Sequence, residues 1–243
     1  MIILIRKRII ALMGLSFCFF TGLLAFVLVG RTIPNTEAFA ARETIPVTVI
    51  VDPGHGGEDG GAVSPDGILE SQLNLAIGHQ VNDLLRFTGQ RTVMTRTEDV
   101  SIHTEGDTIR ARKASDIHNR VALVNSTERS VLLSVHQNSL PSSTITHGAQ
   151  VFWNQQDGAE ALARVIQDSL NSSITTGNEK QPKQIPSTIY LMKHVTSPAI
   201  LVECGFLSNA EETLKLQEPS YQKKLAAAIT SGYLRCLAGE EVP

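Results

Sequence analysis

Residues 47–57 read VTVIVDPGHGG, and this stretch decides the fold class. Its first five residues are all β-branched, which is typical of a strand buried on both faces of a sheet. The Asp-Pro-Gly that follows ends the strand, because proline lacks a backbone N–H and glycine permits a tight turn. His55 and two further glycines come next. We therefore predict a doubly buried strand whose carboxyl end delivers a histidine.

Downstream of this strand, helical and strand patterns alternate. Residues 70–86 have apolar side chains at helical spacing, and Asn209 with Glu212 three residues later predicts a capping box. Further strands are predicted at residues 91–96, 131–135, 148–153 and 199–202. Further helices are predicted at residues 107–125, 157–170 and 220–237, and a loop at residues 171–186. In the helix at residues 107–125, the apolar side consists of Ile109, Ile117, Val121 and Val124. This alternation indicates an α/β fold, with an open, largely parallel twisted sheet and helices on both faces.

The overall composition limits the function. The chain has 243 residues, of which 42% are hydrophobic and 19% charged, as in a globular protein. A formal net charge of −3 disfavours a nucleic-acid-binding protein. Three cysteines are too few for a disulfide scaffold. The class that remains is a globular domain whose fold does not depend on a network of disulfides.

The N-terminal segment differs from the rest of the chain. Residues 9–29 are an uncharged, apolar run preceded by Arg6, Lys7 and Arg8, and about 21 residues are enough to span a bilayer. We predict an N-terminal hydrophobic helix within residues 1–30, and these residues act as a signal or membrane anchor. A linker is predicted at residues 31–45 and one exported domain at residues 46–243. An uncleaved anchor is favoured, while an A-x-A-like site ending at Ala40 leaves secretion after cleavage open.

Side chains suited to metal binding and proton transfer lie at the predicted strand ends. His55 follows the first strand, His136 follows the strand at residues 131–135, and Glu203 follows the strand at residues 199–202. Glu70 begins the helix after the glycine-rich loop. Because the carboxyl ends of parallel strands meet at one edge of a sheet, these four residues are expected to converge there.

These residue types suit a catalytic zinc site. Two imidazoles and one carboxylate hold Zn²⁺ and leave a fourth position for water, so we predict His55, Glu70 and His136 as ligands. Glu203, outside that set, is then the catalytic residue that transfers protons. Taken singly, each histidine could be a polar loop residue and Glu70 a favourable charge at a helix N-terminus. Their joint placement favours the metal site. A phosphate-binding loop is disfavoured, since Asp59 takes the place of the last required glycine.

The chain resembles the zinc-dependent N-acetylmuramoyl-L-alanine amidases of the amidase-3 family. The matching stretches follow the family's order: residues 51–57 (VDPGHGG), Glu70 with residues 74–76 (NLA), 94–97 (MTRT), 134–138 (SVHQN) and 201–209 (LVECGFLSN). The resemblance implies that His55, Glu70 and His136 bind zinc and that Glu203 is catalytic. It also implies an amidase catalytic domain at residues 46–243. The implied substrate is peptidoglycan, cut at the amide between N-acetylmuramic acid and L-alanine of the stem peptide.

Within the family, the chain is most similar to CwlD-type, germination-specific spore cortex amidases. The similarity rests on its short length, its single hydrophobic segment and residues 112–121 (RKASDIHNRV). It implies a role in muramic-lactam formation during sporulation, an extracytoplasmic location and room for a regulatory lipoprotein as partner. Two alternatives stay open. One is a zinc carboxypeptidase acting on wall peptides, with Arg96 binding a terminal carboxylate, and the other is a non-catalytic wall-binding protein.

Overall fold

The structure is a computed structural model that describes residues 47–240 and residue 242. The predicted N-terminal hydrophobic helix and the linker lie outside the described residues, so both stay predictions. Among the helices of the described part, none is long and apolar enough to cross a membrane.

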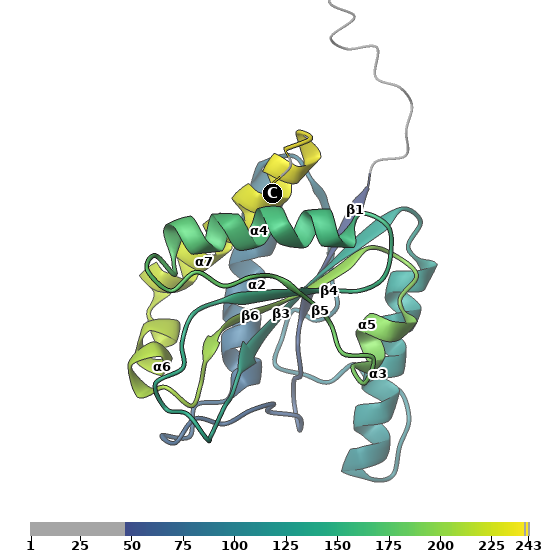
Figure 1. Ribbon diagram of the computed structural model, residues 1–243. Coiled ribbons are helices and arrows are strands. Elements are labelled where there is room, and N and C mark those ends of the chain that lie inside the picture. The colour runs from purple at the N-terminus through teal and green to yellow at the C-terminus, as the bar shows by residue number, and fades with distance from the viewer. Residues whose placement is uncertain (1–46, 241, 243) are drawn as a thin grey trace, which may run out of the picture. The chain divides into compact units, whose positions relative to one another are not determined.

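Strands of the described chain form one six-stranded sheet in the order β2-β1-β3-β6-β4-β5. Figure 1 labels five of these strands, all except β2. Neighbouring strands pair in parallel, except that β4 runs antiparallel to β6. The prediction of a largely parallel sheet is therefore confirmed. The strands are β1 (Thr48–Pro53), β2 (Arg91–Met94), β3 (Ser130–Asn138), β4 (Gln150–Trp153), β5 (Lys183–Gln184) and β6 (Ala199–Phe206).

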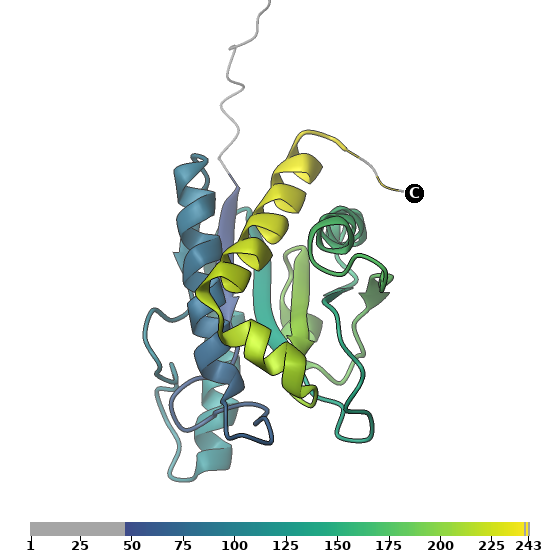
Figure 2. The ribbon, with the colours of Figure 1, turned by 90° about the vertical axis from the view of Figure 1, so that its left-hand side faces the viewer.

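Helices cover both faces of this sheet (Figure 2). One face carries α2 (Glu70–Phe87), α4 (Ala159–Ser173), α6 (Ala210–Gln217) and α7 (Pro219–Leu237). The other face carries α3 (Ile109–Ser126) and α5 (Tyr190–His194). The predicted loop at residues 171–186 begins too early, because α4 continues to Ser173, and it contains the two-residue strand β5. The helix α5 lies where no helix is predicted, because segments this short have no periodicity to detect.

Successive residues of β1 supply two separate hydrophobic cores. Val49 and Val51 pack into the larger core with α2, α4 and α7, whereas Ile50 packs into the smaller core with α3 and α5. Side chains of a strand alternate between faces, so an unbroken apolar run is what a strand covered on both sides requires. All of β1 is buried, which anchors the turn that carries His55.

Two strands extend further than predicted. β3 continues to Asn138 and β6 to Phe206, because the two strands keep pairing beyond their apolar stretches, with His136 opposite Glu203. His136 and Glu203 therefore lie within the strands and not after them. A register shift between His136 and Asn138 interrupts the pairing only after the histidine. This placement gives both side chains the rigidity of the central sheet.

Candidate active site

Three of the four predicted site residues form a compact cluster at the carboxyl edge of the sheet. His55, Glu70 and His136 each offer a ligand atom, and these atoms all lie within 4.8 Å of one another. Glu70 links the two rings, since its Oε2 is 3.3 Å from His55 Nε2 and its Oε1 is 2.8 Å from His136 Nδ1. The predicted convergence of these residues is confirmed, while their role as metal ligands stays a prediction.

Glu70 is held from several directions before any ligand binds. Its Oε2 accepts the backbone N–H of Ala62 at 2.8 Å, and its Oε1 accepts the N–H of Gln137 at 3.1 Å and the side-chain amide of Asn74 at 3.2 Å. Burial alone would raise its pKa, but hydrogen bonds with His136 and His55 hold the pKa of Glu70 well below its usual range. The carboxylate is therefore charged and fixed in one orientation.

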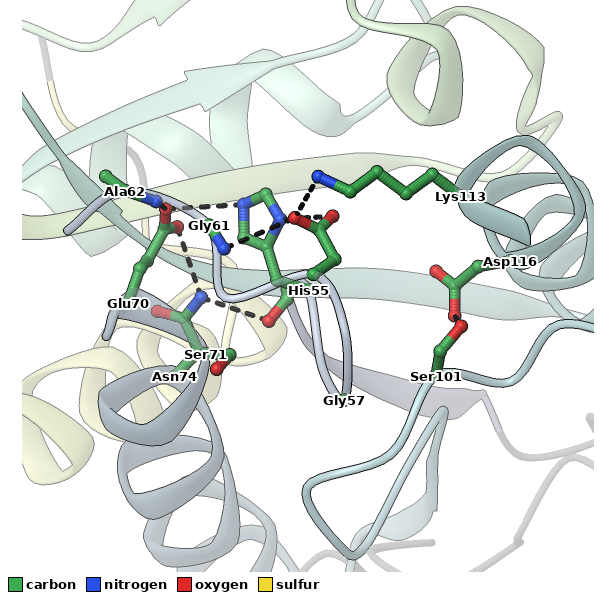
Figure 3. A network of polar contacts seen from close by, with 12 residues as sticks. His55, Gly57, Gly61, Ala62, Glu70, Ser71, Asn74, Ser101, Lys113 and Asp116 are labelled. Carbon is green, nitrogen blue, oxygen red and sulfur yellow. Dashed lines mark hydrogen bonds and ion pairs between the residues drawn. The ribbon is translucent and has the colours of Figure 1, made fainter. Parts of the chain in front are cut away.

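A carboxylate behind His55 orients the imidazole ring. His55 Nδ1 donates to Asp59 Oδ2 at 2.8 Å, and Lys113 Nζ lies 2.7 Å from Asp59 Oδ1. Figure 3 shows the Lys113 side chain extending toward His55. Asp59 thus fixes the ring tautomer and leaves Nε2 facing Glu70, as second carboxylates do for metal-binding histidines. The sequence alone does not reveal this role of Asp59, because contacts within a glycine-rich loop follow no periodic pattern.

Two glycines make room for the cluster. A Cβ on Gly54 would lie 2.2 Å from Nε2 of His136, and a Cβ on Gly61 would lie 2.5 Å from Oε2 of Glu70. Gly61 also has a φ of +70°, which favours glycine. The close approach of backbone and ligands explains the density of glycines better than a phosphate site does.

Two buried arginines hold the backbone that presents His55. Arg96 donates to the carbonyls of Pro53 at 2.9 Å and Gly54 at 3.0 Å. Arg120 donates to the carbonyl of His55 at 2.7 Å. His55 itself has a φ of +62°, a left-handed conformation that costs a non-glycine residue about 1 kcal/mol or more. The two guanidinium groups therefore stabilise a turn that would otherwise be unfavourable.

Glu203 lies beside the cluster with an unusual environment. It is the β6 partner of His136, and its Oε2 is buried without a hydrogen-bond partner among the described residues. Burial raises the pKa of Glu203 to about 7, although the nearby His136 acts to lower it. A carboxyl group with such a pKa can both accept and donate a proton near neutral pH.

The donor set fits zinc. Two imidazoles with one carboxylate are the composition of a catalytic zinc site with an open position. The cluster also places negative charge beside the histidines, since the carboxylates of Asp59 and Glu70 lie 2.8 and 3.3 Å from the two ring nitrogens of His55. A buried oxygen without a partner, as on Glu203, requires a polar species nearby. The site therefore suits a divalent cation beside a general base.

Comparison with known proteins agrees with this geometry. The family model described as N-acetylmuramoyl-L-alanine amidase matches residues 49–235. The germination-specific N-acetylmuramoyl-L-alanine amidase of Bacillus subtilis is 38% identical over 188 residues, covering 77% of this chain and 78% of the relative. The B. subtilis amidase LytC is 30% identical over 213 residues, covering 85% of this chain and 39% of the relative.

A solved structure provides the corresponding comparison of folds. The CwlD amidase from Clostridioides difficile, determined in complex with the GerS lipoprotein, superposes with a TM-score of 0.75 at 32% identity, covering 80% of this chain and 100% of that one. The family match spans the strands and helices that bring His55, Glu70, His136 and Glu203 together. The chain belongs to the amidase-3 family of N-acetylmuramoyl-L-alanine amidases.

Proposed function

We propose that this protein is a zinc-dependent hydrolase of peptidoglycan that cuts the amide between N-acetylmuramic acid and L-alanine of the stem peptide. Family membership supports the amidase activity and the cell-wall substrate. The observation that supports the zinc dependence is the cluster of His55, Glu70 and His136, with ligand atoms within 4.8 Å of one another. Glu203, the strand partner of His136, supplies the proton-transfer group beside it.

The proposed mechanism divides the work between the cluster and Glu203. His55, Glu70 and His136 would hold zinc, which supplies a Lewis acid for the scissile carbonyl and lowers the pKa of water. Glu203 takes a proton from the attacking water and returns it to the departing alanine nitrogen. Burial of this carboxyl group, which acts to raise its pKa, favours holding the proton between the two steps. Asp59 accepts the hydrogen bond from Nδ1 of His55. The other ring nitrogen, Nε2, therefore faces the cluster.

The carboxypeptidase alternative needs a cation that is free to bind a terminal carboxylate. Arg96 does not suit this role, because it is only 3% exposed and donates to the backbone carbonyls of Pro53, Gly54 and Ser71. The non-catalytic alternative is disfavoured by the complete set of ligand and proton-transfer residues. The amidase is therefore the function that the site supports best.

We further propose that the enzyme acts in the spore cortex, where it removes stem peptides so that muramic lactam can form for germination. The germination-specific B. subtilis relative supports this role. The complex of C. difficile CwlD with the GerS lipoprotein supports a lipoprotein partner. The apolar run in residues 9–29 supports an extracytoplasmic location, with the chain tethered by residues 1–30 or secreted after cleavage near Ala40.

Mass spectrometry of digested peptidoglycan tests the amidase proposal. The purified protein with added zinc is expected to release intact stem peptides from the glycan, and a chelator is expected to abolish that release until zinc is restored. Release of single amino acids from peptide ends would instead support the carboxypeptidase. Unchanged release after removal of the metal would contradict the zinc dependence.

A further inference from the structure

An exposed patch lies at the end of the sheet opposite the candidate active site. Phe87, the last residue of α2, is 88% exposed, more than any other large apolar side chain of the described residues. Arg86 precedes it in the helix, Arg91 begins β2, and Arg129 immediately precedes β3. All three arginines are exposed. We call these four residues the amino-end patch.

The strand β1 brings the members of the amino-end patch together. Its first residue, Thr48, is the pairing partner of Arg91 on one side and of Ser130 on the other, and its N–H donates to the carbonyl of Arg129 at 2.9 Å. Arg91 follows Phe87 by four residues, so their Cα atoms are at most about 14 Å apart. Figure 2 shows the start of β1 at the same end of the domain as the C-terminal end of α2. The patch therefore surrounds the point where the chain enters the sheet.

The length of α2 separates the amino-end patch from the candidate active site. This helix begins at Glu70 and ends at Phe87, and its 18 residues rise about 1.5 Å each, so the two Cα atoms are about 26 Å apart. His55 likewise follows the far end of β1. A surface that contacts the patch would leave the active site accessible on the opposite side.

The charge of the amino-end patch is opposite to that of the domain. Residues 46–243 contain 22 Asp and Glu and 16 Lys and Arg, yet the three arginines of the patch outnumber the neighbouring carboxylates of Asp83 and Glu128. In the described part of the chain, the arginines that form ion pairs are Arg112, Arg120, Arg164 and Arg235. The guanidinium groups of the patch therefore remain available. An exposed aromatic ring among such groups is typical of surfaces that bind anionic bilayers.

The chain that precedes the domain indicates what the patch would contact. The apolar run predicted as a membrane anchor ends at residue 29, so 18 residues separate it from Thr48. Fully extended, they span at most about 65 Å. A tether of this length keeps the domain at a high effective concentration near the bilayer. Because the chain enters the sheet within the amino-end patch, the tether draws this part of the domain toward the membrane.

We propose that the amino-end patch binds the surface of an anionic phospholipid bilayer, an inference that rests on the proposed tether by residues 1–30. Phe87 enters the interfacial region, and the three arginines bind headgroup phosphates. In this orientation the candidate active site faces away from the membrane, toward the peptidoglycan. The patch thus gives the tethered enzyme a fixed direction, which a flexible tether alone does not provide.

Fluorescence quenching by brominated lipids tests this orientation. The full chain is reconstituted into vesicles of phosphatidylglycerol and phosphatidylcholine with brominated acyl chains, and Phe87→Trp is compared with Ile145→Trp. Ile145 is 81% exposed and lies beyond the carboxyl end of β3, so it is a matched position on the active-site side. Wild type, with Trp153 as its one tryptophan, gives the baseline. The emission added at position 87 is expected to be quenched, and that added at position 145 is not.

Charge variants test the part played by the arginines. In the Phe87→Trp chain, replacing the three together by glutamine is expected to remove most of the quenching, because each basic group near an anionic surface contributes about fivefold in binding. The control removes the same charge from exposed positions of α6 and the first half of α7: Lys215→Gln, Lys223→Gln and Lys224→Gln. This control should keep the quenching of the Phe87→Trp chain, and equal quenching in the two triple variants would overturn the role of the arginines.

The remaining outcomes separate the patch from the tether. Quenching at both positions, or at neither while the chain co-sediments with the vesicles, would overturn the patch as the bilayer-binding surface. Contact of the patch with a second copy of the chain would give the latter result. A chain that does not co-sediment with the vesicles would overturn the proposed tether, and the patch assignment with it. Release of stem peptides by the same preparations reports separately on the proposed amidase activity.

Discussion

Asp59 shows how a residue outside the candidate ligand set determines what that set can do. It accepts Nδ1–H of His55 and is itself paired with Lys113. Asp59→Ala is expected to weaken zinc binding about ten- to a hundredfold, because the ring loses its fixed tautomer and orientation. Lys113→Met is expected to cause a smaller loss. Competition with a chromophoric chelator measures both.

Arg112 provides the control for this experiment. It lies next to Lys113 in α3 and pairs with Glu58, which does not contact His55, so Arg112→Met should bind zinc as wild type does. If Asp59→Ala bound zinc as tightly as wild type, the orienting role of Asp59 would be wrong.

Gly54 is predicted to tolerate no side chain. Its added Cβ would lie 2.2 Å from Nε2 of His136, so Gly54→Ala is expected to displace the ring, weaken zinc binding and lower the free energy of unfolding by about 1–3 kcal/mol. Gly67→Ala is the contrast: Gly67 has a φ of +84° with nothing near its Cβ position, so only backbone strain of about 1 kcal/mol is expected. Urea unfolding with chelator competition separates the two, and normal zinc binding by Gly54→Ala would refute the steric argument.

At the scale of elements, a buried ion pair fastens α3 to the end of β1. The Arg120 side chain is 2% exposed and pairs with Asp52, 1% exposed, and with Asp116. Arg120→Met should lower the free energy of unfolding by about 3–5 kcal/mol, because it leaves the charge of Asp52 buried without its partner. Arg164→Met, which removes an exposed pair with Glu160, should change it by less than about 1 kcal/mol. Equal effects in urea unfolding would contradict this account.

The same pair predicts a pH dependence of stability. Burial alone would raise the pKa of Asp52, but the charge of Arg120 and hydrogen bonds from Ser134 and Thr95 hold it below its usual value. A lowered pKa in the folded state means that the stabilisation is complete above the unfolded pKa of about 3.9 and is lost as the pH falls through the folded pKa. The difference in unfolding free energy between wild type and Asp52→Asn should therefore shrink below about pH 4. A difference that is constant with pH would be inconsistent with the pair.

How well each element can be predicted depends on its periodicity. The predictions for β1 and α2 agree with the structure within a few residues, because their apolar patterns are regular. In α3, by contrast, Ile109 is expected on the apolar side but is 54% exposed, whereas Arg120 is buried. Only the tertiary pairing with Asp52 makes burial of a guanidinium favourable, and no local pattern contains it.

The predicted capping box at α6 is half correct, for a similar reason. Asn209 accepts the N–H of Glu212 at 3.0 Å as predicted. The Glu212 carboxylate does not complete the box and instead accepts the N–H groups of Gly148 and Phe206 at 2.8 and 2.7 Å. It thereby joins the start of β4 to the end of β6, a contact between segments that are far apart in the sequence.

At the scale of the whole molecule, the fold gathers chemistry from distant parts of the chain. His55, Glu70, His136 and Glu203 come from the end of β1, α2, β3 and β6, which meet at one edge of the sheet. Because strand ends converge in parallel sheets, this set is predictable from the order of strands and helices along the chain. The groups that orient it, such as Asp59 and Arg120, are not, since their roles depend on loop geometry and tertiary pairing.

The central claim is that Glu203 transfers protons beside a zinc ion held by the other three residues. The most direct test compares wild type with Glu203→Gln, measuring bound zinc and the release of stem peptides from peptidoglycan in the same preparations. The account predicts that Glu203→Gln retains zinc with wild-type affinity and releases stem peptides about 10²–10⁴ times more slowly. Release at the wild-type rate by the zinc-loaded variant would contradict it.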